Sequence, residues 1–330
     1  MTADNDIQAL LAKRYRRFAL VEARGVSTLY EHLAVFVAEC PEILAFIASV
    51  PVERRQPNLF LAAVRHVAGV PQDGDQLIQA VRRKSDDIRR VMLSKTTQTN
   101  EPARCSVLLP VLAALPQPLA LLEVGASAGL CLIPDRYGYD YGTAVLEPTG
   151  QTEPQPPIFP CAASTNTPLP ATLPPVIWRA GLDLNPLDVR SESDTAWLET
   201  LVWPGQNDRS ARLRAAIKVA RTDPPKVVRG DVFVDLEPLM EQAPRDATLV
   251  VLHSAVLAYV QDQSRRDQFA KSMLALQAVW ISNEAPNVFP SMARQAPEPP
   301  SPGQFLLSID GSPVAWTGPH GQSLDWFGST

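Results

Sequence analysis

Through most of the first hundred residues, apolar positions recur three and four places apart, with charged residues between them. Between Ile7 and about Val50 this spacing would place the apolar residues along one side of each helical segment, so it predicts amphipathic helices. The pattern continues through residues 59–67 and 75–93. We therefore expect residues 1–95 to form a helical cap domain.

Beyond residue 96 the pattern changes to short apolar runs that alternate with helical periodicity. The strand-like runs are 119–123, 176–184, 226–233, 249–252 and 278–284. The helical segments are 107–115, 194–202, 208–221 and 264–276. Strands that alternate with helices predict an α/β domain with a doubly wound, mostly parallel sheet.

Residues 305–316 read as two strands around Asp310-Gly311, which is a strong hairpin signal. With this antiparallel hairpin at its end, the sheet is expected to have seven strands and to occupy residues 96–330. Residues 147–175 are rich in proline, and we expect them to form an irregular insertion in that domain.

The run L-A-L-L-E-V-G-A-S-A-G-L-C-L at 119–132 has the pattern of a buried parallel strand, a small-residue turn and the start of a helix. Gly125 and Gly129 would let the backbone approach a ligand, and free N–H groups of the following helix would face it. Glu123 could accept a hydrogen bond from an amine or hydroxyl. The alternative is an ordinary turn whose glycines only avoid clashes.

Acids and polar groups also follow the later strands. Asp183 ends the second strand, at the position where a nucleoside ribose lies in doubly wound folds, and Asp231 ends the third. His253 and Ser254 follow the strand at 249–252. The carboxyl ends of parallel strands meet at one edge, so these residues predict a ligand site there.

The motif T-Q-T-N-E-P-A-R-C at 97–105 places Asn100, Glu101 and Arg104 just before a predicted helix. One interpretation is helix capping alone. The other is that these residues border the ligand turn and contact the substrate.

A second candidate substrate segment is D-R-Y-G-Y-D-Y-G at 135–142, which begins with Asp135, Arg136 and Tyr137. Aromatic packing around two glycine turns is an equally good explanation of this segment.

His253 is the leading candidate for a general base, because a histidine titrates near neutral pH and this one follows a central strand. Tyr259, Glu284 and His320 are weaker catalytic candidates. The alternative for His253 is a buried histidine whose hydrogen bonds are satisfied inside the protein.

Composition narrows the function further. The net charge is −5 with a pI of about 5.5, and the basic residues are scattered, so we expect no nucleic-acid partner. The four cysteines lack zinc-site or disulfide-framework spacing, and we expect reduced thiols and no metal. With no signal-peptide pattern and no membrane-spanning stretch, the expected location is the cytoplasm.

The terminal hairpin, the first turn E-V-G-A-S-A-G and the acids after strands two and three resemble the class I S-adenosylmethionine-dependent methyltransferases. The resemblance implies S-adenosyl-L-methionine as cofactor and a small-molecule methyl acceptor. It places Gly125, Ala126, Ser127 and Gly129 at the methionine part of the cofactor. It also implies that Asp183 binds ribose and that Asp231 contacts adenine.

A closer resemblance covers nearly the whole chain. The motifs T-N-E-x-x-R-C, D-R-Y-x-Y-D-Y-G, G-L-D-L-N-P-L-D, L-V-W-P, V-L-H-S-A-V-L-A-Y and P-H-G-Q-S-L are similar to those of a bacterial family called domain of unknown function 2332. That resemblance implies no particular reaction. No N-P-P-Y motif follows strand four, which argues against methylation of DNA amino groups.

Two other classes of function remain open at this point. One is a binding or regulatory protein that keeps the methyltransferase fold without catalysis. The other is a nicotinamide dehydrogenase, which usually has G-x-G-x-x-G where residues 125–130 read G-A-S-A-G-L.

Overall fold

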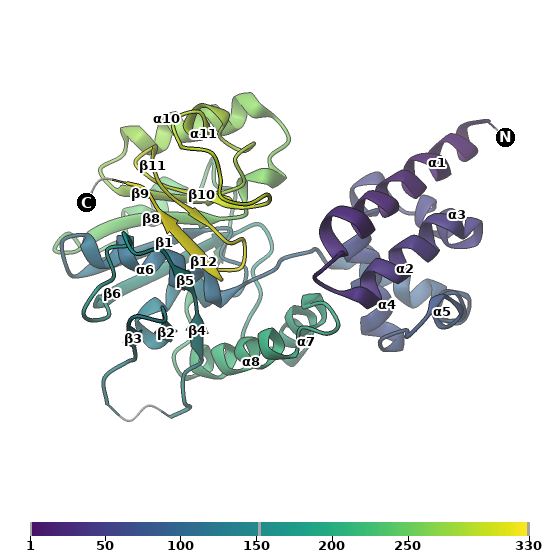
Figure 1. Cartoon of the computed structure of the whole chain (residues 1–330), viewed down its shortest axis with the longest axis horizontal. Coiled ribbons are helices and arrows are strands. Elements are labelled where there is room, and N and C mark those ends of the chain that lie inside the picture. The colour runs from purple at the N-terminus through teal and green to yellow at the C-terminus, as the bar shows by residue number, and fades with distance from the viewer. Residues whose placement is uncertain (1, 151–152, 329–330) are drawn as a thin grey trace. The chain divides into compact units, whose positions relative to one another are not determined.

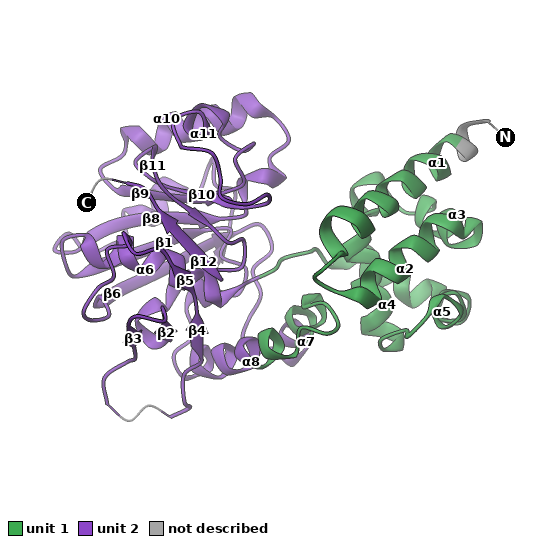
Figure 2. Cartoon of the chain, viewed as in Figure 1, with its two compact units in different colours: residues 1–99, 196–211 green, residues 100–195, 212–330 purple. Residues whose placement is uncertain are grey.

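A computed structural model describes residues 2–150 and 153–328 of the chain (Figure 1). The chain divides into two compact units (Figure 2). Unit 1 comprises residues 1–99 and 196–211, and unit 2 comprises residues 100–195 and 212–330. Residues 196–211 belong to unit 1, although the sequence pattern predicts them as part of the sheet domain.

Unit 1 is helical, as predicted for the first hundred residues. Its helices are α1 (Thr2–Arg17), α2 (Thr28–Glu39), α3 (Pro41–Ala48), α4 (Pro57–Ala68) and α5 (Gly74–Ser94), with the short helices η1 (Phe18–Ala23) and η2 (Val52–Arg54). Proline occupies the first turn of α3 and of α4, where its missing N–H has no intrahelical partner to lose. Ser27 and Asp73 cap α2 and α5, each accepting a backbone N–H with its side chain.

The segment 196–211 completes the core of unit 1. Trp197 is fully buried, and its indole N–H donates to the carbonyl of Thr96 over 2.9 Å. Trp203 packs its ring against Phe18 and Tyr30, with centroids 5.3 and 5.7 Å apart. The helical periodicity of this segment predicted a helix but not which core its apolar side joins.

Unit 2 is built on a large sheet. Its strands are β1 (Leu119–Val124), β2 (Gly138–Asp140), β3 (Val145–Leu146), β4 (Ile158–Pro160), β5 (Ala162–Ala163), β6 (Val176–Asp183), β7 (Lys226–Arg229), β8 (Thr248–Ser254), β9 (Val279–Glu284), β10 (Phe305–Ile309), β11 (Ser312–Thr317) and β12 (Ser323–Trp326). The predicted strands and the hairpin at Asp310-Gly311 are all present.

The helices of this part of the chain are α6 (Cys105–Ala114), α7 (Glu192–Leu201), α8 (Asn207–Thr222), α9 (Leu236–Met240), α10 (Gln263–Ala275) and α11 (Pro290–Ala293), with the short helices η3 (Pro102–Arg104), η4 (Leu130–Leu132), η5 (Pro134–Arg136) and η6 (Leu257–Tyr259). Helices α7 and α8 each contain residues of both units.

The large sheet has the order β5-β12-β11-β10-β9-β8-β1-β6-β7. The run from β7 to β9 is parallel, whereas β9, β10, β11 and β12 pair antiparallel. A mixed α/β fold with a mostly parallel sheet is therefore confirmed. The prediction of seven strands is wrong, because the described residues form nine.

The two additional strands come from segments with weak signals. Strand β12 follows the turn after β11, and β5 lies inside the proline-rich segment and pairs parallel with β12. Strand β4, from the same segment, joins β2 and β3 in a small second sheet. The proline-rich stretch is therefore partly structured rather than wholly irregular.

Side chains alternate between the two faces of the large sheet. One face carries an apolar core with Val124, Trp280 and Leu306 from the strands and Phe269 and Met292 from α10 and α11. Figure 1 shows these two helices together beside β9, β10 and β11. Glu123 aligns with Gly181 and Leu252, so its side chain lies on the other face.

The burial of Trp197 gives a test of unit 1. Trp197→Ala should lower the free energy of unfolding by about 3–5 kcal/mol, because it leaves a large cavity and an unpaired Thr96 carbonyl. Val21→Ala, at a side chain that is 69% exposed, should change it by less than about 0.5 kcal/mol. Urea unfolding followed by circular dichroism measures both. Equal effects would contradict the packing described for Trp197.

Candidate functional site

Strand order locates the candidate site. From β1 the chain continues to β6 and β7 on one side, and then to β8 and β9 on the other side of β1. In open α/β sheets, ligands bind in the crevice outside the carboxyl ends of the strands at the point where the order reverses. Here the order reverses between β1 and β8, which are followed by Gly125 and Ala255.

The turn after β1 is tight and its backbone is fully engaged. Gly125, Ser127 and Gly129 have φ values of +70°, +53° and +74°. The N–H groups of Gly125 and Ala126 donate to the carbonyl of Leu182, and that of Gly129 donates to Ala126. None of these three N–H groups is left to face a ligand.

The remaining N–H groups of the turn donate to two side chains. Those of Ala128 and Leu130 donate to Oδ1 of Asn100 over 3.2 and 2.9 Å. That of Ser127 donates to Oδ2 of Asp183 over 2.8 Å. The prediction that a helix N-terminus follows the turn is wrong, because the chain forms only the three-residue η4 there.

The glycines of the turn are required by packing against the protein itself. A Cβ at Gly125 would lie 2.3 Å from a methyl group of Val256. A Cβ at Gly129 would lie 2.8 Å from Pro225. Both distances are shorter than real contacts, so these neighbours occupy the space next to each glycine. The ordinary-turn interpretation therefore explains both glycines.

Asn100, Glu101 and Arg104 do lie beside this turn, as the substrate-site interpretation expected. The thiol of Cys131 donates to the carbonyl of Glu101 over 3.3 Å. Glu101 also caps η3 by accepting the N–H of Ala103, so its capping role is present as well. All three predicted residues are buried.

Arg104 joins three loops at the site. Its guanidinium donates to the carbonyl of Ser254 over 3.1 Å and to that of Pro319 over 2.9 Å. Next to Pro319, a Cβ at Gly321 would lie 2.0 Å from the carbonyl oxygen of Ala103. The P-H-G turn, and His320 with it, therefore packs directly against the segment that contains Arg104.

Glu123 is the most unusual side chain of the site. It is 4% exposed, and its Oε2 atom has no hydrogen-bond partner among the described residues. Burial raises the pKa of this carboxyl well above its usual value, and the charge of Arg104 only partly opposes the shift. A buried carboxyl of this kind is a protonated acid or the partner of an absent cation.

Sequence reasoning did not single out Asn283 and Thr317, which extend the same buried polar cluster. Asn283 donates to Oγ of Ser254 over 3.1 Å, and Thr317 donates to Oδ1 of Asn283 over 2.7 Å. The available signal was the polar ending S-N-E of an apolar strand.

His253 lies on the opposite face from Glu123, inside the apolar core. Its Nδ1 is 2.8 Å from Oε1 of Glu284, and its Nε2 accepts the indole N–H of Trp280 over 3.0 Å. The ring is fully buried and packs against Phe269 and Trp280. Both ring nitrogens are therefore engaged, and the satisfied-histidine interpretation is favoured over a general base.

Of the other catalytic candidates, Glu284 is hydrogen-bonded to His253. Glu284 is buried, and its Oε1 also accepts the N–H groups of Val256 and Leu257. Tyr259 is 63% exposed in η6. His320 lies in the turn after β11, on the Arg104 side of the sheet.

The tyrosine-rich segment has structural partners. Asp135 forms a two-pronged ion pair with Arg179 at 3.0 and 3.1 Å. Arg136 pairs with Asp223, and the buried hydroxyl of Tyr137 donates to the carbonyl of Leu130. The packing interpretation is favoured here over substrate contact.

Asp231 also has local partners. Its Oδ1 accepts the N–H of Phe233 over 2.9 Å, and its own N–H donates to Asp235 over 2.8 Å. These bonds form the turn after β7.

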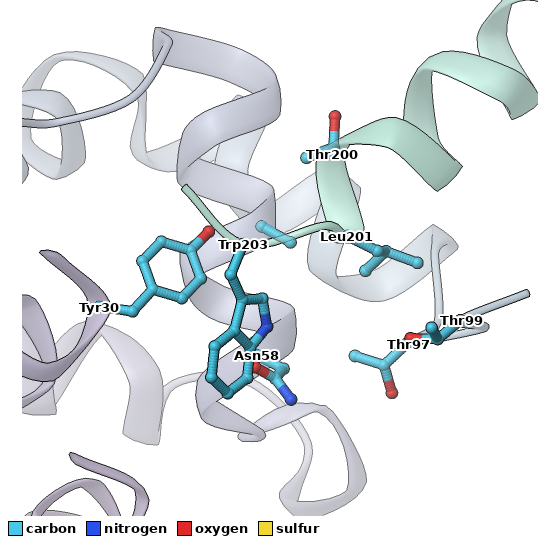
Figure 3. A pocket seen from close by; sticks show the side chains of 8 residues that line it. Tyr30, Asn58, Thr97, Thr99, Thr200, Leu201 and Trp203 are labelled. Carbon is cyan, nitrogen blue, oxygen red and sulfur yellow. The ribbon is translucent and has the colours of Figure 1, made fainter. Parts of the chain in front are cut away.

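A pocket in unit 1 is lined by Tyr30, Asn58, Ala62, Thr97, Thr99, Thr200, Leu201 and Trp203 (Figure 3). Burial raises the pKa of Tyr30 to about 12, and the nearby Arg65, which donates to the carbonyls of Thr200 and Val202, partly opposes this shift. The Tyr30 hydroxyl and Asn58 Oδ1 have no partner among the described residues. The enclosed space, about 20 Å³, is of the order of one water molecule, so it suits a bridging water better than a substrate.

A family model described as an uncharacterized protein conserved in bacteria, DUF2332, matches residues 12–326. The chain belongs to this family. No curated protein and no solved structure matches the chain. The family match spans both units and every residue of the candidate site.

Among the described residues, no helix is long and apolar enough to cross a membrane. Within the same residues, no group of three or more His, Cys, Asp or Glu side chains is arranged to hold a metal ion.

The raised pKa of Glu123 predicts a pH-dependent stability difference. Because the folded protein holds this proton more tightly than the unfolded chain, the wild type should lose stability as pH rises above the ordinary value of 4.5. Glu123→Gln cannot titrate, so its stability relative to the wild type should rise steadily as the pH increases from 5 toward 9.

Urea unfolding at each pH measures the difference, with Glu237→Gln at an exposed position as control. A difference between Glu123→Gln and wild type that stays constant with pH would contradict the raised pKa of Glu123.

Asn100 offers a second test. Asn100→Ala removes the acceptor of two buried N–H groups, which should cost about 2–4 kcal/mol of unfolding free energy. Asn166→Ala, at an exposed position, should cost less than about 0.5 kcal/mol. Thermal and urea unfolding measure both variants. A loss below 1 kcal/mol for Asn100→Ala would mean that Asn100 does not hold the turn.

Proposed function

We propose that the protein binds S-adenosylmethionine at the carboxyl edge of its sheet and acts as a methyltransferase-like protein on a small-molecule acceptor. The observation that carries the proposal is the placement of three carboxylates. Glu123, Asp183 and Asp231 end or follow β1, β6 and β7, which are neighbouring parallel strands beside the point where strand order reverses. Ligands of doubly wound sheets bind at that edge.

The nucleoside part of the cofactor fits this edge. Asp183 is partly exposed, and the N–H groups of Ser127 and Asn185 each donate to one of its oxygens. We propose that this carboxylate also accepts hydrogen bonds from the ribose hydroxyls, because the acid at this strand end lies beside the ribose in doubly wound folds. The same backbone bonds hold the carboxylate in a fixed orientation, which favours binding.

The methionine part does not fit the turn as described. The side chain of Val256 occupies the space over Gly125, and the N–H groups from Gly125 to Leu130 all donate within the protein. The same engagement argues against a nicotinamide dehydrogenase, because a pyrophosphate needs free N–H groups at this turn.

The acceptor would contact the buried polar cluster around Arg104. Glu101, Glu123, Ser254 and Asn283 supply hydrogen-bonding groups there, and each is nine-tenths or more buried. Such a lining suits a small polar molecule better than a polymer surface. When bound, S-adenosylmethionine would supply an activated methyl group to this region.

A second candidate function is a binding protein that has no catalytic activity. The engagement of both ring nitrogens of His253 favours it, because the leading base candidate then has no lone pair for an acceptor. Product analysis separates the two. A methyltransferase should convert S-adenosylmethionine to S-adenosylhomocysteine with some member of a small-molecule panel, whereas a binding protein should retain the cofactor unchanged with all of them.

Calorimetry with S-adenosylhomocysteine tests the proposed ligand. Asp183→Asn should weaken binding about tenfold or more, because a charge-assisted bond to ribose contributes about 1.5–3 kcal/mol. Asp188→Asn, at an exposed carboxylate paired with Arg190, should bind like the wild type. Circular dichroism checks that both variants are folded. No heat and no thermal shift with either form of the cofactor, for folded wild type, would overturn the cofactor assignment.

A further inference from the structure

The segment Ala255–Leu257 follows β8 and packs against the turn after β1. Both methyl groups of Val256 lie within 2.7 Å of the position that a Gly125 Cβ would take. Val256 therefore fills the side of the turn that a ligand would approach. Val256 is only partly buried, and it also packs against the apolar core on the His253 face of the sheet.

A relay of hydrogen bonds from β9 holds this segment in place. Oε1 of Glu284 accepts the N–H groups of Val256 and Leu257 over 2.9 and 3.1 Å. The same oxygen is 2.8 Å from Nδ1 of His253, and Trp280 donates to the other ring nitrogen. With Nδ1 carrying its proton, His253 orients the carboxylate that holds the segment.

In the arrangement that Glu284 holds, the backbone of Ala255 has an unusual conformation. Ala255 has φ of +57°, in the left-handed region that residues with a Cβ seldom adopt. Release of Val256 and Leu257 from Glu284 would let Ala255 return to an ordinary conformation. This strain favours opening of the segment, which would also withdraw the fully buried Leu257 from the apolar core.

We propose that Val256 is the residue that closes the methionine end of the cofactor site, and that Glu284 and His253 are positioning residues that hold it there. This inference rests on the function proposed above. It accounts for the side chain over Gly125, whereas the pairing of the N–H groups from Gly125 to Leu130 does not depend on Val256. The ligand binds only the open arrangement, so its measured affinity is reduced by the fraction of molecules that are open.

Hydrogen exchange of the wild-type protein without ligand tests the opening directly. The amides of Val256 and Leu257 should exchange at least about tenfold faster than those of Val251 and Leu252 in β8, because local release exposes the first pair alone. Equal exchange rates for the two pairs would show that the segment opens only with the sheet, and would overturn the inference whatever the ligand is.

A size series at one position tests the role of the side chain. With S-adenosylhomocysteine as probe, Val256→Ala should bind about threefold to tenfold more tightly than wild type, and Val256→Ile about threefold more weakly, since the larger side chain favours closure. Val260→Ala, four residues along the same loop, is the matched control and should bind like wild type.

The outcomes are distinguishable. Equal affinity across the series, with clear binding, overturns the role of Val256 and leaves the proposed function standing. Absence of heat from every variant overturns the proposed cofactor, and the exchange rates then decide alone whether the segment opens. If affinity falls from the Ala to the Val to the Ile variant at position 256, and the amides of Val256 and Leu257 exchange fast, the results support both the inference and the proposed function.

Discussion

Buried backbone N–H groups must be paired, and the turn at residues 125–130 meets this requirement without any ligand. Asn100 supplies one oxygen to two of those N–H groups, and Asp183 supplies another oxygen to a third. Asn100 can do so only if the chain leading to α6 lies across the turn. That path also brings Arg104 to the carbonyls of Ser254 and Pro319, so the other loops of the edge depend on the same pairing.

Most of the fold was predictable because its long elements have strong periodicity, and because an Asp-Gly pair suits the positive φ values of the hairpin, 48° and 77°. Strands β5 and β12 have two and four residues, too few for a period to show. The helix expected after Gly129 could not extend, since Pro134 disfavours helical geometry at the residue before it. Nothing in a single pattern indicates which core a helix such as α7 will join.

The sequence predicts that the candidate site lies at the carboxyl ends of the strands, but not how its side chains are oriented or paired. Sequence order placed Glu123, Asp183 and His253 at strand ends, yet the alternation of a strand decides which face each side chain occupies. Glu123 aligns with Leu252, one residue before His253, and this single step puts the histidine in the apolar core. Its engagement with Trp280 depends on another strand, 27 residues away, which no local motif reveals.

Because residues 196–211 complete the core of unit 1, this unit cannot finish folding early during synthesis. A chain that emerges from the ribosome in order presents α1 to α5 long before Trp197 is made, so the helical unit lacks part of its core while β1 and β6 are already available. Its completion must wait for residues that follow the second strand of the sheet. A fragment ending near residue 95 would expose the apolar surface that Trp197 and Trp203 cover. Such a fragment should therefore aggregate, and it should not reproduce the folded unit.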